Sequence, residues 1–357
     1  MKVLISVPHL DMPGGVANYY RILRYHLGDD IRYFEVGERP RESSGIAKIP
    51  RFVADFWKFH RELAGGDYDL VHLNPSLATY SVIREGVLIL IAKLHRRRLV
   101  VFFRGWDASC ERSVSKYFRW LFSTVYGRAD AFIVLGEVFE KSLRSLGIKA
   151  PVFRETTVVD DSIFSAANGL DSDRKAGSAP VDVLYLSRLV AGKGLRESIE
   201  AFALLQARIP DCRLVVAGAG PGAEEARQLV ADLGLSGVRF VGHVTGEAKR
   251  EEFMRADIFL FPTFYGEGIP NGVLEAMAFG LPVITRAVGG LPDFFENERM
   301  GFITDSRDNR EFARLLETLD VDPGMRMKMG RYNREFARER FAASEVARRL
   351  LDIYARI

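Results

Sequence analysis

The sequence predicts an α/β protein with two successive parallel-sheet domains that face a cleft. Apolar segments of strand length alternate with segments of helix length along most of the chain. The alternation stops once, near residues 165–180, and then starts again. A length of 357 residues is sufficient for two domains that each bury a core. Alternation of this kind favours parallel sheets with helices on both faces.

The predicted first domain spans residues 1–165. It begins with the strand KVLISV, because this apolar run is too short for a signal peptide. A turn at Gly14-Gly15 follows, and the next segment has Val16 and Tyr20 at helical spacing. The further strand candidates of this domain are IRYFEV, DLVHLN, LVVFFR and AFIVL.

The predicted linker spans residues 166–180, where the chain is polar and rich in Gly, Ser and Ala. The second domain, residues 181–335, restarts the alternation with VDVLYLS, RLVVAG, VRFVG, DIFLFP, PVIT and GFIT. The segment from Met325 onward is rich in Arg, Glu and Ala, and we expect it to be too polar all round for a core helix. Its end, residues 336–357, is predicted as a separate C-terminal helix.

The composition is that of an ordinary globular protein, with 48% apolar and 27% charged residues and a net charge of +3. Cys110 and Cys212 lie far apart, so we expect neither a disulfide framework nor a metal site, and we expect a reducing, cytoplasmic compartment. No segment approaches the roughly 20 apolar residues of a membrane-spanning helix. The basic run HRRR has no nucleic-acid recognition motif beside it, so no nucleic-acid partner is expected.

The most informative stretch is FPTFYGEGIPNGVLEAMAFG, which begins at Phe261. A short strand is followed by a Gly/Pro-rich turn and by a helix that starts at Pro270 and Asn271. The start of a helix presents unpaired N–H groups and the positive end of a dipole, which suits an anionic ligand. Glu267 precedes the helix and Glu275 lies on it, and both carboxylates can accept hydrogen bonds from sugar hydroxyls.

Arg188 and Lys193 lie five positions apart in SRLVAGKG, across a turn that contains Gly192 and Gly194. A guanidinium fork and an ammonium group on one loop fit a pyrophosphate. The alternative for this pair alone is two solvated charges on a loop. The later segment VVAGAGPG hints at a dinucleotide fingerprint, but it departs from the GxGxxG spacing.

The Glu267-x₇-Glu275 spacing, with its PNG, EAMA and GLPV flanks, resembles the signature of the retaining family 4 glycosyltransferases. This resemblance implies the GT-B fold, with two Rossmann-like domains, an acceptor-side domain first and a nucleotide-sugar donor-binding domain second. In such proteins the last helix crosses back onto the first domain. A G-x-G-P turn also occurs in this family, which favours a glycosyltransferase over a nicotinamide enzyme. The alternative is a buried strand and a helix with one solvated Glu.

The resemblance also implies roles for the donor-side residues. Arg188 and Lys193 would hold the donor phosphates, and Glu275 would accept the ribose hydroxyls. Glu267 would hold a hydroxyl of the transferred sugar and is a catalytic candidate. The remaining donor-side candidates are backbone groups, at Gly268, Ile269, Asn271, Val244 near the base, and Gly15 over the phosphate.

In the first domain, FFRGWD resembles the family's H-G-x-D pattern but places Arg104 where many members have His. Arginine stays protonated and cannot act as a general base. It can still stabilise charge on a leaving phosphate or clamp an acidic acceptor, so Arg104 is the second catalytic candidate. The acceptor-side candidates are Gly14, His72 at the end of a strand, and Asp107.

Two segments, 51–63 and 115–128, mix aromatic and basic residues. Burial of the aromatic side chains in the first domain's core is the favoured interpretation. The alternative is contact with anionic lipid headgroups.

The sequence therefore predicts a retaining, metal-independent glycosyltransferase without a cofactor. It would move a sugar from a nucleoside diphosphate donor to a saccharide or lipid-linked acceptor, in the synthesis of a cell-surface polysaccharide or glycoconjugate. We expect a cytoplasmic protein, with peripheral contact at the inner face of the membrane as an alternative. The other candidate functions are a nucleotide-sugar epimerase, a phosphorylase and a non-catalytic nucleotide-sugar-binding partner of a membrane enzyme.

Overall fold

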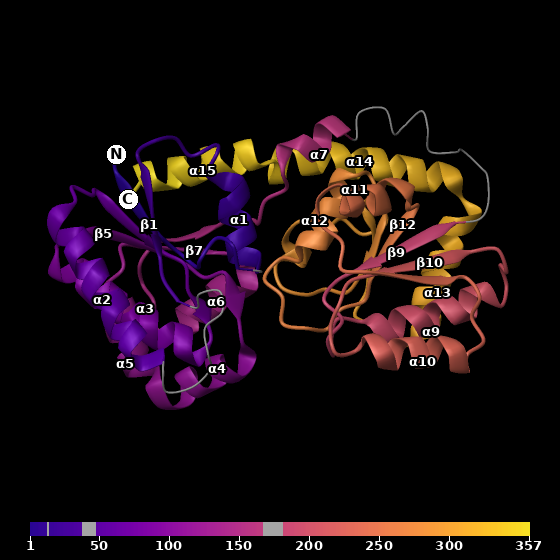
Figure 1. Cartoon of the computed structure of the whole chain (residues 1–357), viewed down its shortest axis with the longest axis horizontal. Helices are drawn as coiled ribbons and strands as arrows, with labels where there is room; N and C mark the ends of the chain where they lie inside the picture. The colour runs from indigo at the N-terminus through magenta and orange to yellow at the C-terminus, as the bar shows by residue number, and fades with distance from the viewer. Residues whose placement is uncertain (13, 38–47, 167–180) are drawn as a thin grey trace. The chain divides into compact units, whose positions relative to one another are not determined.

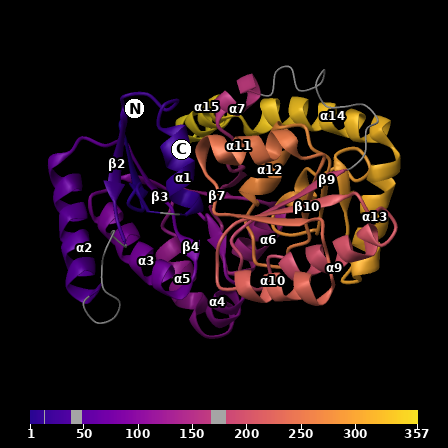
Figure 2. The ribbon, with the colours of Figure 1, turned by 45° about the vertical axis from the view of Figure 1, so that its right-hand side comes forward.

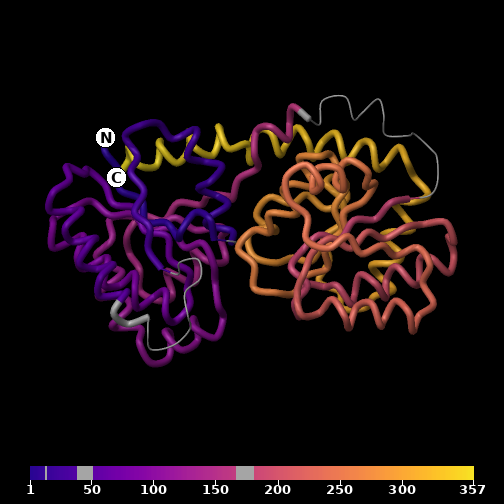
Figure 3. Tube along the Cα trace, viewed as in Figure 1, coloured from indigo at the N-terminus to yellow at the C-terminus, as the bar shows by residue number. Residues whose placement is uncertain are grey.

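The computed structural model describes residues 1–12, 14–37, 48–166 and 181–357. Its contacts divide the chain into two compact units, drawn in Figures 1 and 3. The first unit comprises Met1–Val158, Gly266–Ile269 and Ala343–Ile357, and the second comprises Val159–Tyr265 and Pro270–Ala342. Of the predicted linker, residues 167–180 lie outside the described residues, and Ala166 ends helix α7 (Asp161–Ala166).

The first unit is built on a parallel sheet of six strands in the order β2-β1-β3-β5-β7-β8. The strands are β1 (Val3–Val7), β2 (Ile31–Glu35), β3 (Leu70–Leu73), β5 (Arg98–Phe102), β7 (Ala131–Val134) and β8 (Val152–Arg154). All residues of β1, β3 and β7 are buried, as expected for strands that are covered on both faces. Both ends of the chain belong to this unit.

The helices of the first unit are α1 (Gly15–Leu23), α2 (Lys48–Gly65), α3 (Thr79–Leu94), α4 (Ala108–Ser113), α5 (Arg119–Tyr126), α6 (Glu137–Ser145) and α15 (Ala343–Ala355). A π-helical turn, Val114–Phe118, joins α4 to α5. Helix α3 packs against both α2 and α5, and α1 packs against α15, as Figure 2 shows. A small parallel pair, β4 (Ser76–Leu77) and β6 (Gly105–Trp106), extends the loops after β3 and β5.

The second unit is built on a second parallel sheet of six strands, in the order β11-β10-β9-β12-β13-β14. These strands are β9 (Asp182–Leu186), β10 (Arg213–Ala217), β11 (Val238–Gly242), β12 (Ile258–Phe261), β13 (Val283–Thr285) and β14 (Gly301–Ile303). The strand order reverses between β9 and β12, and ligands of open α/β sheets bind beyond the carboxyl ends of strands at such a point.

The helices of the second unit are α7, α9 (Leu195–Gln206), α10 (Ala223–Asp232), α11 (Gly246–Arg255), α12 (Asn271–Ala278), α13 (Asn309–Val321) and α14 (Pro323–Phe341). Helix α9 packs against α10 and α13, and α12 packs against α14. A short 3₁₀ turn, Leu291–Asp293, follows β13.

The predicted fold class is confirmed, since each unit has an open parallel sheet with helices around it. The expectation for the segment after Met325 is wrong. It forms two helices, α14 and α15, and both bury apolar side chains, among them Phe341, Val346 and Leu350. The charged residues dominate the composition, but the apolar residues recur at helical spacing and form a buried stripe. Among the described residues, no helix is both long and apolar enough to cross a membrane.

Candidate functional site

In the second unit, the loops after β9 and β12 begin at neighbouring strands and are joined by hydrogen bonds. The carbonyl oxygen of Gly192 accepts one bond from Phe264 N at 2.8 Å and another from Thr263 Oγ1 at 3.1 Å. Gly194 has a φ of 82°, and a Cβ there would lie 2.6 Å from the Pro262 backbone. The loop that carries Arg188 and Lys193 is therefore fixed in close contact with the loop after β12.

The two predicted phosphate-binding side chains of this loop differ in their surroundings. Arg188 is exposed. Lys193 is only 6% exposed, and its ammonium nitrogen lies 4.4 Å from the centre of the Tyr265 ring, within the range of a cation–π contact. Tyr185 donates a hydrogen bond to the Lys193 carbonyl oxygen at 3.1 Å. The buried ammonium is held in place, whereas the guanidinium is open to a ligand.

The glycines of the VVAGAGPG turn pack against the Arg188 loop. A Cβ at Gly218 would lie 1.8 Å from the Ser187 carbonyl oxygen, and one at Gly220 would lie 2.4 Å from that of Leu189. Leu189 N donates to Ala219 O at 3.0 Å. These glycines therefore allow the two loops to make a close backbone contact.

Helix α12 starts as predicted, with Pro270 as its N-cap residue and Asn271 as its first residue. Glu275 is buried on this helix, at 7% exposed. Its Oε1 accepts a hydrogen bond from Lys249 Nζ on α11 at 2.7 Å. Sequence reasoning missed Lys249, because the segment GEAKREEFMR contains several charges and no pattern distinguishes this one. Val244 is partly exposed in the loop before α11.

A cavity of about 240 Å³ lies in the second unit beside the same loop. It is lined by Leu189, Gly192, Phe264 and residues of α9 and α10. Arg188, Lys193 and Glu275 do not line it.

In the first unit, the loop after β1 leads into α1 through Gly14 and Gly15. Gly14 has a φ of 155° and occupies the N-cap position of α1. A Cβ at either glycine would meet no other atom within 4 Å. The backbone at the start of α1 is therefore open to close approach by a ligand.

Arg104 follows β5 and is held by two aromatic rings. Its guanidinium carbon lies 3.7 Å from the ring centre of Tyr19 and 4.3 Å from that of Phe102. Its Nε and Nη1 atoms are buried and have no hydrogen-bond partner among the described residues. The ring faces supply the electrostatic partner of this cation. Arg104 thus remains a fixed positive charge.

His72 is fully buried at the end of β3. Its Nδ1 contacts the hydroxyl of Tyr354 on α15, and its Nε2 lies 3.4 Å from the hydroxyl of Tyr20 on α1. Burial, followed by the positive charge of Arg104, lowers the pKa of His72 to about 3. The neutral imidazole therefore links three elements of the core, an arrangement that favours a structural role over contact with an acceptor.

Asp107 is the N-cap residue of α4. Its Oδ1 accepts hydrogen bonds from Ser109 N at 2.7 Å and Cys110 N at 2.9 Å. Bonds from Ser109 and Cys110 hold the pKa of this exposed carboxyl below its usual value. The carboxylate is engaged in starting the helix.

The remaining predicted residues lie between β12 and α12. Glu267 and Gly268 are partly exposed, and Ile269 is 8% exposed. The segment Gly266–Ile269 is grouped with the first unit, whereas Asn271 and Glu275 belong to the second. Within the described ranges, no group of three or more His, Cys, Asp or Glu side chains could hold a metal ion.

Two family models match the chain. Residues 171–336 match the model described as glycosyl transferases group 1, and residues 14–155 match the glycosyl transferase 4-like domain. The first match includes the Arg188 loop and α12, and the second includes Gly14 and Arg104.

Two curated relatives carry the names of polysaccharide biosynthesis enzymes. WcaL of Salmonella typhimurium, named as a colanic acid biosynthesis glycosyltransferase, is 27% identical over 72% of this chain and 62% of its own length. AmsK of Erwinia amylovora, named as an amylovoran biosynthesis glycosyltransferase, is 25% identical over 80% of this chain and 68% of its own. The chain thus spans about three fifths of the length of WcaL.

Among solved structures, HepE of Anabaena in complex with UDP superposes with a TM-score of 0.76 over 100% of both chains, at 18% identity. A sucrose-phosphate synthase from Thermosynechococcus elongatus gives a TM-score of 0.76 at 19% identity, over 100% of this chain and 99% of its own. At these identities the likeness establishes the fold.

Proposed function

The chain belongs to the family 4 glycosyltransferases of GT-B fold, and we propose that it transfers a sugar from a nucleoside diphosphate donor to a saccharide or lipid-linked acceptor. The transfer retains the anomeric configuration and needs no metal. The names of WcaL and AmsK support a role in polysaccharide biosynthesis, and the UDP bound to HepE supports a nucleotide donor. A lipid-linked acceptor would be met at the inner face of the membrane.

The observation that carries this proposal is the cationic loop after β9. It lies at the strand reversal where a nucleotide is expected, and it holds a buried ammonium and an open guanidinium on a rigid backbone. Arg188 and Lys193 would neutralise the pyrophosphate. The positive end of the α12 dipole, at Asn271, would add to this charge stabilisation.

The other roles follow from the side-chain chemistry. Glu275, oriented by Lys249, accepts hydrogen bonds from the ribose hydroxyls, and backbone near Val244 contacts the base. Glu267 holds a hydroxyl of the transferred sugar and so orients the anomeric carbon. Gly15 lets the backbone of α1 approach the donor phosphate.

The transfer step needs no protein base. The acceptor hydroxyl oxygen forms a bond to the anomeric carbon while the bond from that carbon to the diphosphate breaks. The acceptor proton passes to the departing phosphate oxygen on the same face of the sugar. Arg104 cannot accept this proton, but its fixed charge stabilises the negative charge that develops on the phosphate.

Calorimetric titration of UDP, GDP and ADP in the presence of a chelator tests the donor site. We expect one nucleotide to bind selectively, and the Arg188→Ala/Lys193→Ala variant to bind it at least tenfold more weakly. The matched control is Arg208→Ala/Arg255→Ala, which removes two exposed cations that form surface ion pairs of the same unit. Absence of binding by all three nucleotides, or equal losses in both variants, would refute the donor site.

Turnover measurements separate the proposed reaction from its competitors. A transfer product that forms with a sugar acceptor and keeps the anomeric configuration of the donor supports the proposal. Free epimer formed without an acceptor identifies an epimerase, and cleavage that depends on phosphate identifies a phosphorylase. Tight nucleotide binding without turnover over a broad acceptor panel identifies a binding partner.

A further inference from the structure

Seven consecutive residues of the first unit, SKYFRWL at 115–121, are all exposed. They include four large apolar side chains, at Tyr117 (67% exposed), Phe118 (56%), Trp120 (78%) and Leu121 (51%). Large apolar residues of a helix normally cover a core. An exposed cluster of this kind marks an interaction surface.

The core beneath this segment is filled by other residues of the same helical stretch. Val114, Phe122 and Tyr126 are buried, and the Phe122 and Tyr126 rings stack with their centres 4.4 Å apart. The favoured expectation of burial therefore holds for Phe122 and Tyr126 and is wrong for residues 115–121. The π-helical turn Val114–Phe118 lies at this point, and a π turn carries an extra residue that shifts the following side chains around the helix axis.

The charged side chains within the segment itself are of one sign. Arg112, Lys116, Arg119 and Arg128 are exposed, and the stretch from 112 to 128 contains no Asp or Glu. Aromatic side chains with interleaved cations suit the boundary between anionic headgroups and acyl chains, where the rings insert and the cations meet phosphates.

The start of the neighbouring helix α3 also exposes large apolar side chains. Tyr80 is 84% exposed and Ile83 is 65% exposed. Helix α3 packs on α5, and Tyr126 donates a hydrogen bond to the Val82 carbonyl oxygen at 2.9 Å. Figures 1 and 2 show α3, α4 and α5 together.

We propose that residues 115–121, with Tyr80 and Ile83, form a docking surface for an anionic lipid bilayer. A second copy of the chain is a poorer occupant, because a two-fold interface would place Lys116 and Arg119 against the same cations of the partner. The purpose of this surface rests on the proposed function, since it would bring the site to a lipid-linked acceptor. Binding to lipid is measurable without donor or acceptor.

The test is co-sedimentation of the full chain with vesicles of phosphatidylcholine alone and with 30% phosphatidylglycerol. We expect the wild type to bind the anionic vesicles at least tenfold more tightly than the neutral ones, and added salt to weaken binding. Phe118→Ser/Trp120→Ser removes apolar contacts and Lys116→Gln/Arg119→Gln removes charge. Each should weaken binding by about tenfold or more.

The matched controls lie on α2, where Trp57 is 57% exposed. Trp57→Ser and Lys58→Gln/Arg61→Gln should retain binding within about twofold. An emission shift to the blue on adding anionic vesicles, present in Trp57→Phe and absent once Trp120 is also replaced by Phe, would locate the contact.

Three results would overturn the proposal. The first is that the wild-type protein does not bind anionic vesicles, and the second is that both double variants bind them as well as the wild type does. The third is self-association in sedimentation that the variants abolish, without any lipid binding. Nucleotide affinity, measured on the same samples, distinguishes failure of this proposal from failure of the proposed function. A protein that binds nucleotide but not lipid contradicts the docking surface and supports the donor site.

Discussion

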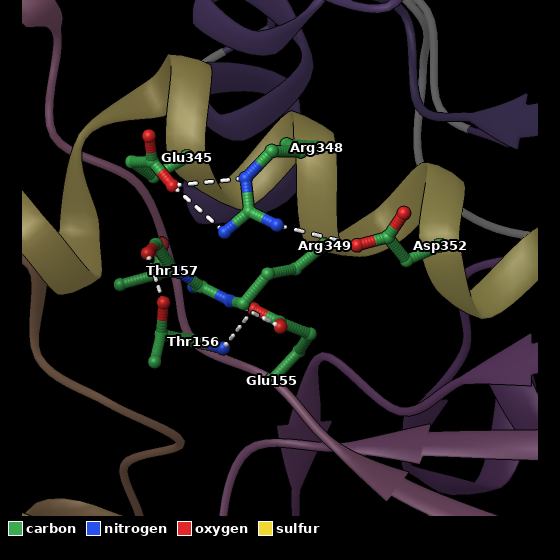
Figure 4. A network of polar contacts seen from close by, with 7 residues as sticks. All are labelled: Glu155, Thr156, Thr157, Glu345, Arg348, Arg349 and Asp352. Carbon is green, nitrogen blue, oxygen red and sulfur yellow. Dashed lines mark hydrogen bonds and ion pairs between the residues drawn. The ribbon is translucent and has the colours of Figure 1, made fainter.

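Arg349 on α15 donates two hydrogen bonds to the carboxylate of Glu155, from Nε at 2.7 Å and from Nη2 at 3.0 Å (Figure 4). The two residues lie 194 positions apart in sequence. Glu155 is 6% exposed, and its Oε2 also accepts a bond from Thr156 N at 3.0 Å. This bidentate pair fastens the last helix to the segment that follows β8 in the first unit.

Removal of Arg349 should destabilise the first unit. Arg349→Ala leaves a buried carboxylate without its cation, and we expect a loss of about 3 kcal/mol in the free energy of unfolding. Urea unfolding followed by tryptophan fluorescence measures this, because Trp57, Trp106 and Trp120 are the protein's 3 tryptophans and all lie in the first unit.

The neighbouring Arg348 is a matched control for this change. It bonds Glu345 and Asp352 on the same helix, and its side chain is 61% exposed (Figure 4). Arg348→Ala should cost at most about 1 kcal/mol. Equal losses in the two variants would contradict a special role for the Glu155 pair.

The stability of the first unit should fall as the pH decreases below about 6.5. The pKa of His72 is lowered to about 3 in the folded protein, against about 6.5 in an unfolded chain. Above the unfolded value neither state binds the proton. Below it only the unfolded state does, so stability is lost by up to about 1.4 kcal/mol per pH unit down to the folded pKa.

Urea unfolding at several pH values from about 7 down to about 4.5 measures how the free energy of unfolding changes with pH. His72→Gln should reduce the slope of stability against pH, whereas His26→Gln, at an exposed position, should retain it. A slope that is identical in all three proteins would show that other groups cause it.

Gly218→Ala should weaken nucleotide binding by about tenfold or more. Its Cβ would lie 1.8 Å from the Ser187 carbonyl oxygen, so the loop that carries Arg188 must move. Gly234→Ala is the control, because Gly234 also has a positive φ, of 64°, and its Cβ would meet nothing within 4 Å. It should cost about 1 kcal/mol of stability and leave the affinity intact. Calorimetric titration with the nucleotide that binds the wild type selectively compares the affinities of the two variants.

Lys249→Met should weaken nucleotide binding about fivefold, because Glu275 loses the ion pair that orients its carboxylate at 2.7 Å. Arg255→Met changes an exposed cation at the end of the same helix and should have no effect. An affinity that rises in Lys249→Met would mean that Lys249 competes with the ribose for Glu275.

The sequence predicted all six strands of the second sheet and five of the six strands of the first, because their residues are contiguous and their apolar runs are bounded by turns. Strand β8 was missed, since its three residues are too short a run to form a recognisable pattern. The phosphate-binding candidates were also local, since Arg188 and Lys193 occupy one loop. The Lys249–Glu275 pair spans 26 positions and depends on the position of α11 relative to α12. The exposure of residues 115–121 coincides with a π-helical turn, which no residue pattern in the sequence predicts.

The sequence analysis also missed the buried apolar face of α15. Its composition is dominated by charge, and only the spacing of Val346, Leu350 and Tyr354 shows the buried face. The contacts of Tyr354 with His72 and of Arg349 with Glu155 then link positions that no local pattern connects.

The membership of α15 in the first unit has a consequence for synthesis of the chain on the ribosome. All strands of the first sheet emerge before residue 155, but α1 and His72 receive their α15 partners only after the second unit has been translated. The second unit can reach its native contacts earlier, since Val159–Ala342 precedes α15. The half of the protein that is made first is therefore finished last, and its incomplete core must remain unaggregated in the meantime.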